Sequence, residues 1–383
     1  MNNEKLQYID SAAFQQDLIA WYQRNKRDLP WRKDQDPYKI WVSEVMLQQT
    51  KVDTVIPYFN RFIKKYPTPE ALAEADEEEV LKEWEGLGYY SRARNLHHAV
   101  REVVASYGGK VPDTPDELGD LKGVGPYTKG AILSIAFNQP EPAVDGNVMR
   151  VFSRILKIED DISQQRTKKL FEHYVRKLID TSDPSSFNQA VMELGALICT
   201  PKSPACLLCP VQTHCQAFAA GIEETLPVKK KAKKQKTIAY VVILAKNKND
   251  EYIIEKRPDN GLLANLWQFP MVPIEEIGWD HLENWVYGEY GLQIALGDKV
   301  GKLKHVFSHI IWQLEIYQAE TMEETVKDRR LKFVNCQELS NYPFPVSHQK
   351  IMGYIEEEAG KENIKVELQN DKVKRHTRST SLN

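Results

Sequence analysis

Four cysteines form the densest group of potential metal ligands in this sequence. They fall within 17 residues in the pattern C-x6-C-x2-C-x5-C, as Cys199, Cys206, Cys209 and Cys215. Thiolates in one compact loop suit a tetrahedral zinc ion or an iron–sulfur cluster. Zinc sites commonly have two C-x2-C pairs and this segment has one, so the spacing fits a zinc ribbon poorly. The fifth cysteine, Cys336, is expected to be a small buried side chain.

A glutamate lies among apolar residues of a predicted helix. In PYKIWVSEVMLQQT, Ile40, Glu44 and Leu47 recur at i, i+4 and i+7 and therefore share one helix face. Burial raises the pKa of a carboxyl group because it disfavours the charged form, and a general acid working near neutral pH needs such a pKa. The alternative is a glutamate at the helix edge whose carboxylate reaches water.

A glycine-rich turn and an aspartate supply a second set of candidates. LKGVGPYTKGAI places Gly123 and Gly125 in a tight turn between two predicted helices, where backbone N–H groups can reach a phosphate. Asp145 follows 20 residues after Gly125, in AVDGNVMRV at the start of another predicted helix. From these residues alone, an ordinary helix connection and plain helix capping by Asp145 and Asn147 remain the simpler interpretations.

Helices joined by short loops must position these residues. Phe14, Leu18, Trp21 and Tyr22 recur at helical spacing, and Asp36-Pro37 is typical of a helix start. The pattern predicts helices at about 37–49, 53–65, 76–85, 91–107, 114–120, 126–137, 147–157, 167–179 and 186–198.

The pattern changes after a lysine-rich segment, KKKAKKQK at 229–236. Strand-like runs follow at 237–245, 251–257 and 305–319, with one helical stretch at about 279–290. The predicted fold class is therefore multidomain, α followed by α+β. We expect a helical domain at 10–225 with a turn near 119–133 and the cysteine loop at 199–215, a linker at 226–236, an α+β domain at 237–356 and a polar, disordered tail at 360–383.

Composition excludes several classes of protein. The chain has 383 residues, 42% of them hydrophobic and 27% charged, which is globular rather than disordered or collagen-like. The formal net charge is −3, so any basic binding surface must be local. No apolar run approaches the roughly 20 residues that span a bilayer. The first residues lack a signal pattern, so we expect a cytoplasmic protein. We also expect a monomer without a membrane partner.

The ordered motifs resemble those of the endonuclease III-like, helix–hairpin–helix superfamily of DNA glycosylases. The cysteine spacing, LKGVGPYT and VDGNV occur in that order, and WVSEVMLQQTKV, GLGYYSRARNL and AVDGNV are similar to the adenine DNA glycosylase branch. The resemblance covers residues 10–355. It implies two helical subdomains with DNA in the cleft between them, a [4Fe–4S] cluster held by the four cysteines, and a Nudix-like second domain.

The resemblance also implies an activity, which is removal of adenine mispaired with 8-oxoguanine or guanine in double-stranded DNA. Glu44 would protonate the adenine ring and Asp145 would stabilise the cationic sugar, with Asn147 and Tyr127 completing the catalytic set and Tyr127 expected to bond Asp145. Superfamily members that also cut the backbone carry a nucleophilic lysine where this chain has Tyr127, and a phenol cannot form a Schiff base. A monofunctional glycosylase is therefore expected.

Contacts to DNA follow from the same motifs. Gln49 matches the side chain that the family inserts into the vacated base stack, and Leu87 and Tyr89 match its probes beside 8-oxoguanine. The motif Phe307-Ser308-His309 matches the segment with which the second domain reads that base, although an ordinary strand edge is the simpler interpretation. The full set of expected DNA contacts is Gln49, Thr50, Leu87, Tyr89, Gly123, Gly125, Phe307, Ser308 and His309.

The second domain resembles Nudix hydrolases whose metal-binding residues have been replaced. When the final glycine of the R-E-U-x-E-E-x-G box is aligned with Gly291, Asn284 and Trp285 occupy the R-E positions, and Gly288 and Glu289 the paired glutamates. One carboxylate of three is too few for a Mg²⁺ site. Three alternatives stay open: a bifunctional endonuclease III-type glycosylase and lyase, a non-catalytic iron–sulfur protein that senses lesions, and a Nudix hydrolase that removes damaged nucleotides.

Overall fold

The computed structural model describes residues 4–230 and 235–355. By compactness the chain divides into two units. The first consists of Met1–Ala75 and Arg92–Ala232, and the second of Asp76–Ser91 and the chain from Lys233 onward. The expected tail at 360–383, and part of the expected linker, lie outside the described residues. None of the described helices is long and apolar enough to cross a membrane.

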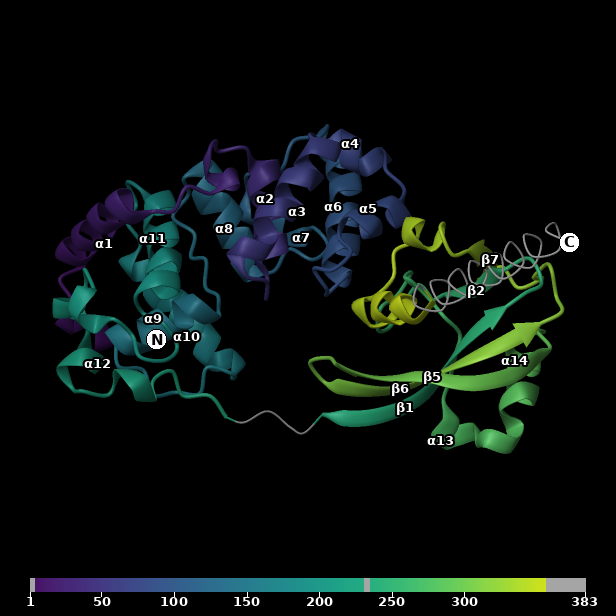
Figure 1. Cartoon of the computed structure of the whole chain (residues 1–383). Coiled ribbons are helices and arrows are strands. Elements are labelled where there is room, and N and C mark those ends of the chain that lie inside the picture. Colours follow the sequence, from purple (N-terminus) through teal and green to yellow (C-terminus); the bar gives the residue numbers. More distant parts are fainter. Residues whose placement is uncertain (1–3, 231–234, 356–383) are drawn as a thin grey trace, which may run out of the picture. The chain divides into compact units, whose positions relative to one another are not determined.

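The first unit is helical, as the sequence predicts (Figure 1). Aspartate or threonine side chains cap several of its helices, and proline occupies the first turn of α2, α4, α7, α8 and α11. Its α-helices are α1 Ser11–Asn25, α2 Pro37–Leu47, α3 Val52–Lys65, α4 Pro69–Glu74, α6 Ser91–Tyr107, α7 Pro115–Asp120, α8 Pro126–Phe137, α9 Gly146–Ile155, α10 Gln165–Leu178, α11 Pro184–Leu197 and α12 Gln216–Ala219. Of these, α4 and α12 were not predicted.

Two structural features fix the helices that carry the candidate residues. The apolar cluster that joins α1, α9, α10 and α11 contains Phe14, Phe152 and Phe187, all almost fully buried. The end of α2 is held by the buried guanidinium of Arg92, which donates hydrogen bonds to the carbonyls of Val45 and Met46 at 2.8 and 2.9 Å. Arg92 therefore satisfies helix carbonyls that have no partner within α2 itself.

The second unit is built on a mixed seven-stranded sheet with the strand path β3-β2-β1-β6-β5. In Figure 1 the long strands β1, β6 and β5 run side by side. Strands β1 and β6 pair in parallel, and β5 and β6 pair antiparallel. Apolar clusters cover both faces of the sheet. The elements are α5 Glu77–Glu83, β1 Lys236–Lys246, β2 Glu251–Lys256, β3 Trp267–Gln268, β4 Met271–Val272, α13 Ile274–Ile277, α14 Leu282–Tyr290, β5 Ile294–Val306, β6 Ile310–Thr321 and β7 Leu331–Asn335.

The strand-like run at 305–319 contains parts of two strands. That segment contains the end of β5, a turn at Phe307-Ser308-His309, and most of β6. The Phe307 N–H donates to the Ile310 carbonyl at 2.8 Å and closes the hairpin. The turn was missed because β-branched and aromatic residues flank it closely and it contains no glycine or proline. Strand β5 was missed because IALGDKVGKLK is rich in lysine and glycine and mostly solvent-exposed.

Candidate active site and cysteine loop

One pocket of the first unit brings together the two carboxylates that the sequence singles out. Glu44 comes from α2, Tyr127 from the first turn of α8, and Asp145 from the N-terminus of α9, and all three line this pocket. The pocket encloses about 150 Å³ and opens to solvent. Glu44 is thus placed around one space with two residues that follow it by 83 and 101 positions in the sequence.

Glu44 is a desolvated carboxyl group, as its apolar helix face predicts. The residue is 4% exposed and accepts a hydrogen bond of 2.6 Å at Oε2 from the Tyr127 hydroxyl. Burial raises the pKa of Glu44 to about 7; the bond from Tyr127 and the charge of Arg32 oppose this rise, and the charge of Asp145 adds to it. A group with this pKa can donate a proton near neutral pH.

The expected hydrogen bond between Tyr127 and Asp145 is wrong, because the Tyr127 hydroxyl donates to Glu44. Helices α2 and α8 pack against each other, so the first turn of α8 faces Glu44. Burial, with the neighbouring carboxylates, raises the pKa of the Tyr127 phenol well above its usual value, so Tyr127 stays a neutral donor.

Asp145 serves as a helix cap and lines the pocket at the same time. Its Oδ1 accepts a hydrogen bond from the Val148 N–H at 2.7 Å, and its Oδ2 accepts one from Asn147 Nδ2 at 3.0 Å. Burial raises the pKa of Asp145, while these two hydrogen bonds lower it. Capping and the pocket position are therefore compatible, and capping explains how the carboxylate is held in one orientation.

Asn147 extends this contact toward the cysteine loop. Its Oδ1 accepts from Arg150 Nη1 at 3.0 Å, and Arg150 Nε donates to the Cys199 carbonyl at 2.9 Å. Further along α9, Arg154 Nη1 donates to Cys199 Sγ at 3.2 Å. A continuous series of hydrogen bonds therefore runs from the carboxylate of Asp145 to the first cysteine of the loop.

Sequence reasoning missed a buried ion-pair cluster on the α11 side of the pocket. The Glu193 carboxylate accepts hydrogen bonds from Arg27 Nε at 2.7 Å and from Arg32 Nη2 at 2.9 Å, and Arg32 Nε also donates to Gln189 at 3.1 Å. These bonds outweigh burial and lower the pKa of Glu193 to about 2. The available signal was the same as for Glu44, an acidic residue inside the apolar run FNQAVMELGAL.

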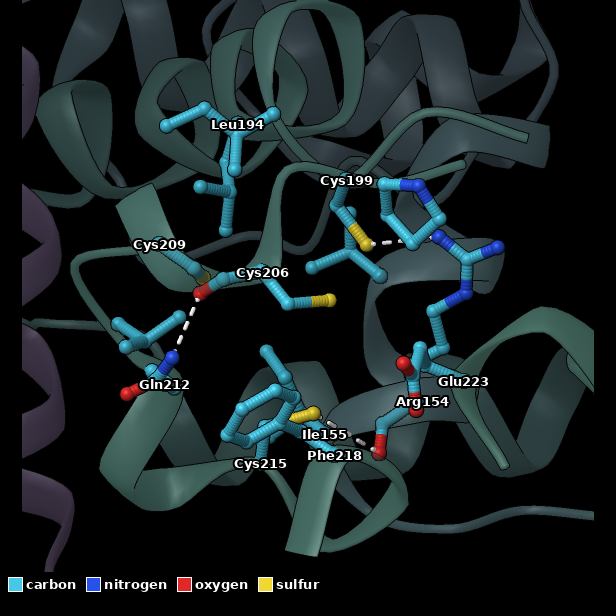
Figure 2. Close-up of a pocket in the computed structure, with 14 residues that line it drawn as sticks. Arg154, Ile155, Leu194, Cys199, Cys206, Cys209, Gln212, Cys215, Phe218 and Glu223 are labelled. Carbon is cyan, nitrogen blue, oxygen red and sulfur yellow. Dashed lines mark hydrogen bonds between the residues drawn. The ribbon is translucent and has the colours of Figure 1, made fainter. Parts of the chain in front are cut away.

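The four cysteines surround a second, smaller pocket (Figure 2). Apolar side chains, among them Val151, Leu194 and Phe218, and the guanidinium of Arg154 complete its lining. Burial raises the pKa of the Cys209 thiol to about 12. Four sulfur donors around one partly apolar space, with an arginine beside them, fit a negatively charged iron–sulfur cluster. In the present side-chain positions, no group of three or more described His, Cys, Asp or Glu side chains is close enough to hold a metal ion.

The expected DNA contacts are divided between the two units. Gly123 has φ +83° and a Cβ there would lie 2.7 Å from Asn95 Cβ, so the turn requires glycine. Gly125 is the N-cap of α8. Gln49, just after α2, also has a positive φ of 58°, and Thr50 lines the active pocket.

The other expected contacts lie in the second unit. Leu87 is 7% exposed, whereas Tyr89 is 46% exposed. The hydroxyl groups of Tyr89 and Ser308 are 2.9 Å apart. In the same turn, the Phe307 ring packs against Trp312, with ring centroids 4.8 Å apart. The structure thus brings two of the expected lesion contacts together, although 219 positions separate them in the sequence.

Comparisons with known proteins agree with this arrangement. Residues 42–177 match the model of the HhH-GPD superfamily of base excision DNA repair proteins, and residues 240–354 match the Nudix domain. The rat adenine DNA glycosylase is 36% identical over 91% of this chain and 79% of its own length. The chain belongs to the adenine DNA glycosylase family.

Other relatives of this family cover most of the chain. The adenine DNA glycosylase of the fission yeast Schizosaccharomyces pombe is 33% identical, over 87% of each chain. That of Buchnera aphidicola from Acyrthosiphon pisum is 31% identical, over 88% of this chain and 96% of its own. Among solved structures, a thermostable thymine-DNA glycosylase aligns with 57% of this chain and 98% of its own, with a TM-score of 0.50 and 28% identity. The adenine DNA glycosylase family thus accounts for both the helical unit and the Nudix-like unit.

Proposed function

We propose that this protein is a monofunctional DNA glycosylase that removes adenine from A:8-oxoguanine and A:G mispairs and leaves an abasic site. The observation that carries the proposal is the pocket in which Glu44, with a pKa of about 7, lies with Asp145. Two carboxyl groups with different environments are the arrangement that hydrolysis of glycosidic bonds requires. Membership of the adenine DNA glycosylase family supports adenine as the base that is removed.

The reaction can be written with these residues. The target nucleotide first leaves the base stack, which costs a few kcal/mol. Protonated Glu44 donates its proton to a ring nitrogen of adenine as the N-glycosidic bond breaks, and the bonding electron pair leaves with the base. The carboxylate of Asp145 stabilises the positive charge that develops on the sugar. Water then adds to the sugar carbon, and ionised Glu44 accepts its proton, which restores the starting state.

Tyr127 supports a reaction that stops at the abasic site. Its phenol is neutral and donates to Glu44, and it has no amine with which to attack the sugar. This distinguishes the proposal from the bifunctional alternative. The non-catalytic alternative gives no reason for a carboxyl group with a pKa of about 7 in a pocket that it shares with a second carboxylate.

Recognition of 8-oxoguanine is proposed for the second unit. The base differs from guanine by an oxygen on C8 and a hydrogen on N7, and a hydroxyl group can donate to the one or accept from the other. Ser308 and Tyr89 place two hydroxyl groups 2.9 Å apart on an exposed surface. The remaining Nudix carboxylate, Glu289, accepts from Arg330 Nη1 at 3.0 Å. Because the one carboxylate left in the box is paired with an arginine, the second unit is a poor Mg²⁺ site. Recognition of the base is therefore favoured over metal-dependent hydrolysis.

A [4Fe–4S] cluster is proposed for the cysteine loop, with Cys199, Cys206, Cys209 and Cys215 as its ligands. When bound, the cluster would cross-link the loop and hold it folded. Arg154 beside Cys199 would partly balance the negative charge of the site. Iron and sulfide analysis of anaerobically purified protein tests this assignment, and stoichiometric zinc without iron would refute it.

The decisive experiment measures base release under single-turnover conditions from three duplexes, with adenine opposite 8-oxoguanine, guanine or thymine. We expect release from the first two, fastest from the first, and almost none from the third. Strand breaks should form only after alkali or heat is applied. Breaks that form without such treatment, together with a borohydride-trapped adduct of the wild-type protein, would instead support the bifunctional enzyme.

A further inference from the structure

Three side chains around the loop Gly86–Tyr90 hold a short backbone segment of the same unit. Glu85 Oε1 accepts a hydrogen bond from the Phe344 N–H at 2.8 Å. Lys82 Nζ donates to the Tyr342 carbonyl at 3.2 Å and to Glu85 Oε2 at 2.5 Å. The Tyr90 hydroxyl donates to the Phe344 carbonyl at 3.4 Å. Hydrogen bonds therefore connect helix α5 and the loop that follows it to the segment 342–344, and these residues act both as donors and as acceptors.

The segment 342–344 is fixed in the core of the second unit. Phe344 is fully buried and its ring stacks on Phe269, with centroids 5.6 Å apart, inside the core under the sheet. Proline occupies positions 343 and 345, so Phe344 has the only backbone N–H between them. Glu85 accepts that N–H, and the bond connects the loop directly to the core of the Nudix-like unit.

The loop that follows Glu85 carries the lesion-reading tyrosine in an unusual backbone conformation. Gly86, Gly88 and Tyr89 have φ values of +99°, +72° and +48°. A left-handed conformation at a residue other than glycine costs roughly 1–2 kcal/mol, so the surrounding contacts must hold Tyr89 in place. The Gly86 N–H donates to the Tyr90 hydroxyl at 3.2 Å and closes the loop. Held in this way, the Tyr89 hydroxyl lies next to Ser308.

We propose that Glu85 is a positioning residue for discrimination between 8-oxoguanine and guanine. Its carboxylate, between Lys82 and the Phe344 N–H, fixes the loop so that Tyr89 and Ser308 form one reading surface. Glu85 touches neither the base nor the reacting atoms, and acts through Tyr89. The inference rests on the proposed function, and it adds a specificity determinant that lies outside both the catalytic pocket and the 307–309 turn.

The test compares single-turnover adenine release from A:8-oxoguanine and A:G duplexes. Glu85→Ala should lower the preference for 8-oxoguanine about tenfold, since a well-placed base contact is worth about that much, and should leave the A:G rate nearly unchanged. Glu85→Gln should keep most of the preference, because an amide oxygen still accepts the Phe344 N–H. Glu78→Gln is the matched control, since Glu78 lies on the same helix and pairs with Lys256 at 2.8 Å; it should leave the preference unchanged.

A double-variant experiment separates positioning from general stability. If Glu85 acts through the Tyr89–Ser308 surface, adding Glu85→Ala to Ser308→Ala should cause no further loss of preference. An unchanged preference in Glu85→Ala, equal losses on both duplexes with a lowered Tm, or additive losses in the double variant would each overturn the inference. Absence of adenine release by the wild type from either duplex would refute the proposed function instead.

Discussion

The α2 side and the α11 side of the pocket each present a buried glutamate, and the two carboxyl groups have opposite properties. Glu44 is 4% exposed and Glu193 is 1% exposed. The pKa of Glu44 is raised to about 7, whereas that of Glu193 is lowered to about 2. Burial acts on both in the same direction, so burial alone does not explain the difference.

The donors around each group explain it. Glu193 accepts hydrogen bonds from the guanidinium groups of Arg27 and Arg32 and from the Arg27 backbone N–H. Glu44 has one neutral partner, the Tyr127 hydroxyl, and a nearby carboxylate, Asp145. Both carboxyl groups are desolvated. Glu193 stays ionised because cations compensate its charge, whereas Glu44 holds a proton near neutral pH because no such compensation lowers its pKa. Four predictions test this comparison, from the largest expected effect to the smallest.

Removing the proton donor should have the largest effect. Glu44→Gln keeps the shape of the side chain and cannot transfer a proton, so we expect a loss of single-turnover adenine release of about 10²–10⁴-fold. Binding to an A:8-oxoguanine duplex should change little, because Glu44 is inside the pocket. Normal excision by this variant would show that another group supplies the proton.

Removing the carboxylate of Glu193 should affect both the stability of the protein and the pH dependence of adenine release. Glu193→Gln leaves two partly buried arginines, Arg27 and Arg32, without a counter-charge. Breaking a fully buried pair costs about 3–5 kcal/mol, so we expect a smaller loss here. The unbalanced charge of Arg32 also favours ionised Glu44, so the alkaline limb of the rate–pH profile should move to lower pH. Glu141→Gln, which removes an ion pair with the exposed Arg176, is the control. An unchanged profile would mean that Arg32 does not act on Glu44.

The two glutamates should give opposite pH dependences of stability. Because the pKa of Glu44 is raised, its contribution to the free energy of unfolding is fully present below its unfolded pKa of about 4.5. That contribution is lost as pH rises through about 7. Because the pKa of Glu193 is lowered, its contribution to the free energy of unfolding is fully present above about pH 4.5 and is lost as pH falls toward 2.

Thermal unfolding from pH 3 to 8 measures this difference. Glu44→Gln should gain stability relative to the wild type as pH rises from 5 to 8. The gain should approach about 3 kcal/mol, because the wild type must either keep its buried acid protonated or ionise it at a cost. A constant difference between the two proteins across this range would contradict a folded pKa near 7.

Removing the hydroxyl that bonds Glu44 should have the smallest effect. The hydrogen bond from Tyr127 favours the ionised carboxylate, so Tyr127→Phe should raise the pKa of Glu44 further and move the alkaline limb of the rate–pH profile upward by less than about one unit. Single-turnover rates from pH 5 to 9 measure the shift. A downward shift would show that Tyr127 acts on Glu44 in some other way.

Local patterns in the sequence singled out side chains that the structure brings together in one pocket. The spacing of Ile40, Glu44 and Leu47 indicated a desolvated carboxyl group, and four cysteines in 17 residues indicated a ligand loop. Most helix positions were predicted correctly because proline and capping residues mark where helices begin. Such signals lie within one helix or one loop, so they can be recognised from a single sequence.

Contacts between distant segments were not predictable in this way. The partner of Tyr127 was predicted wrongly, because a sequence does not specify which way the first turn of α8 faces. Glu193 was missed because its two arginines lie more than 160 positions away. The hairpin at 307–309 was missed because it contains no glycine or proline, and only the pairing of β5 with β6 reveals it.

The sequence by itself determined which residue types are present and which elements carry them: an acid on an apolar helix face, an aspartate at a helix start, and a cysteine loop. Only the tertiary structure decided their electrostatic state and their grouping. It placed cations around Glu193, and no described cation in direct contact with Glu44. It also grouped residues 76–91 with the Nudix-like unit. The physical reason is that pKa values and hydrogen bonds depend on distances of a few ångströms, which packing between distant segments sets.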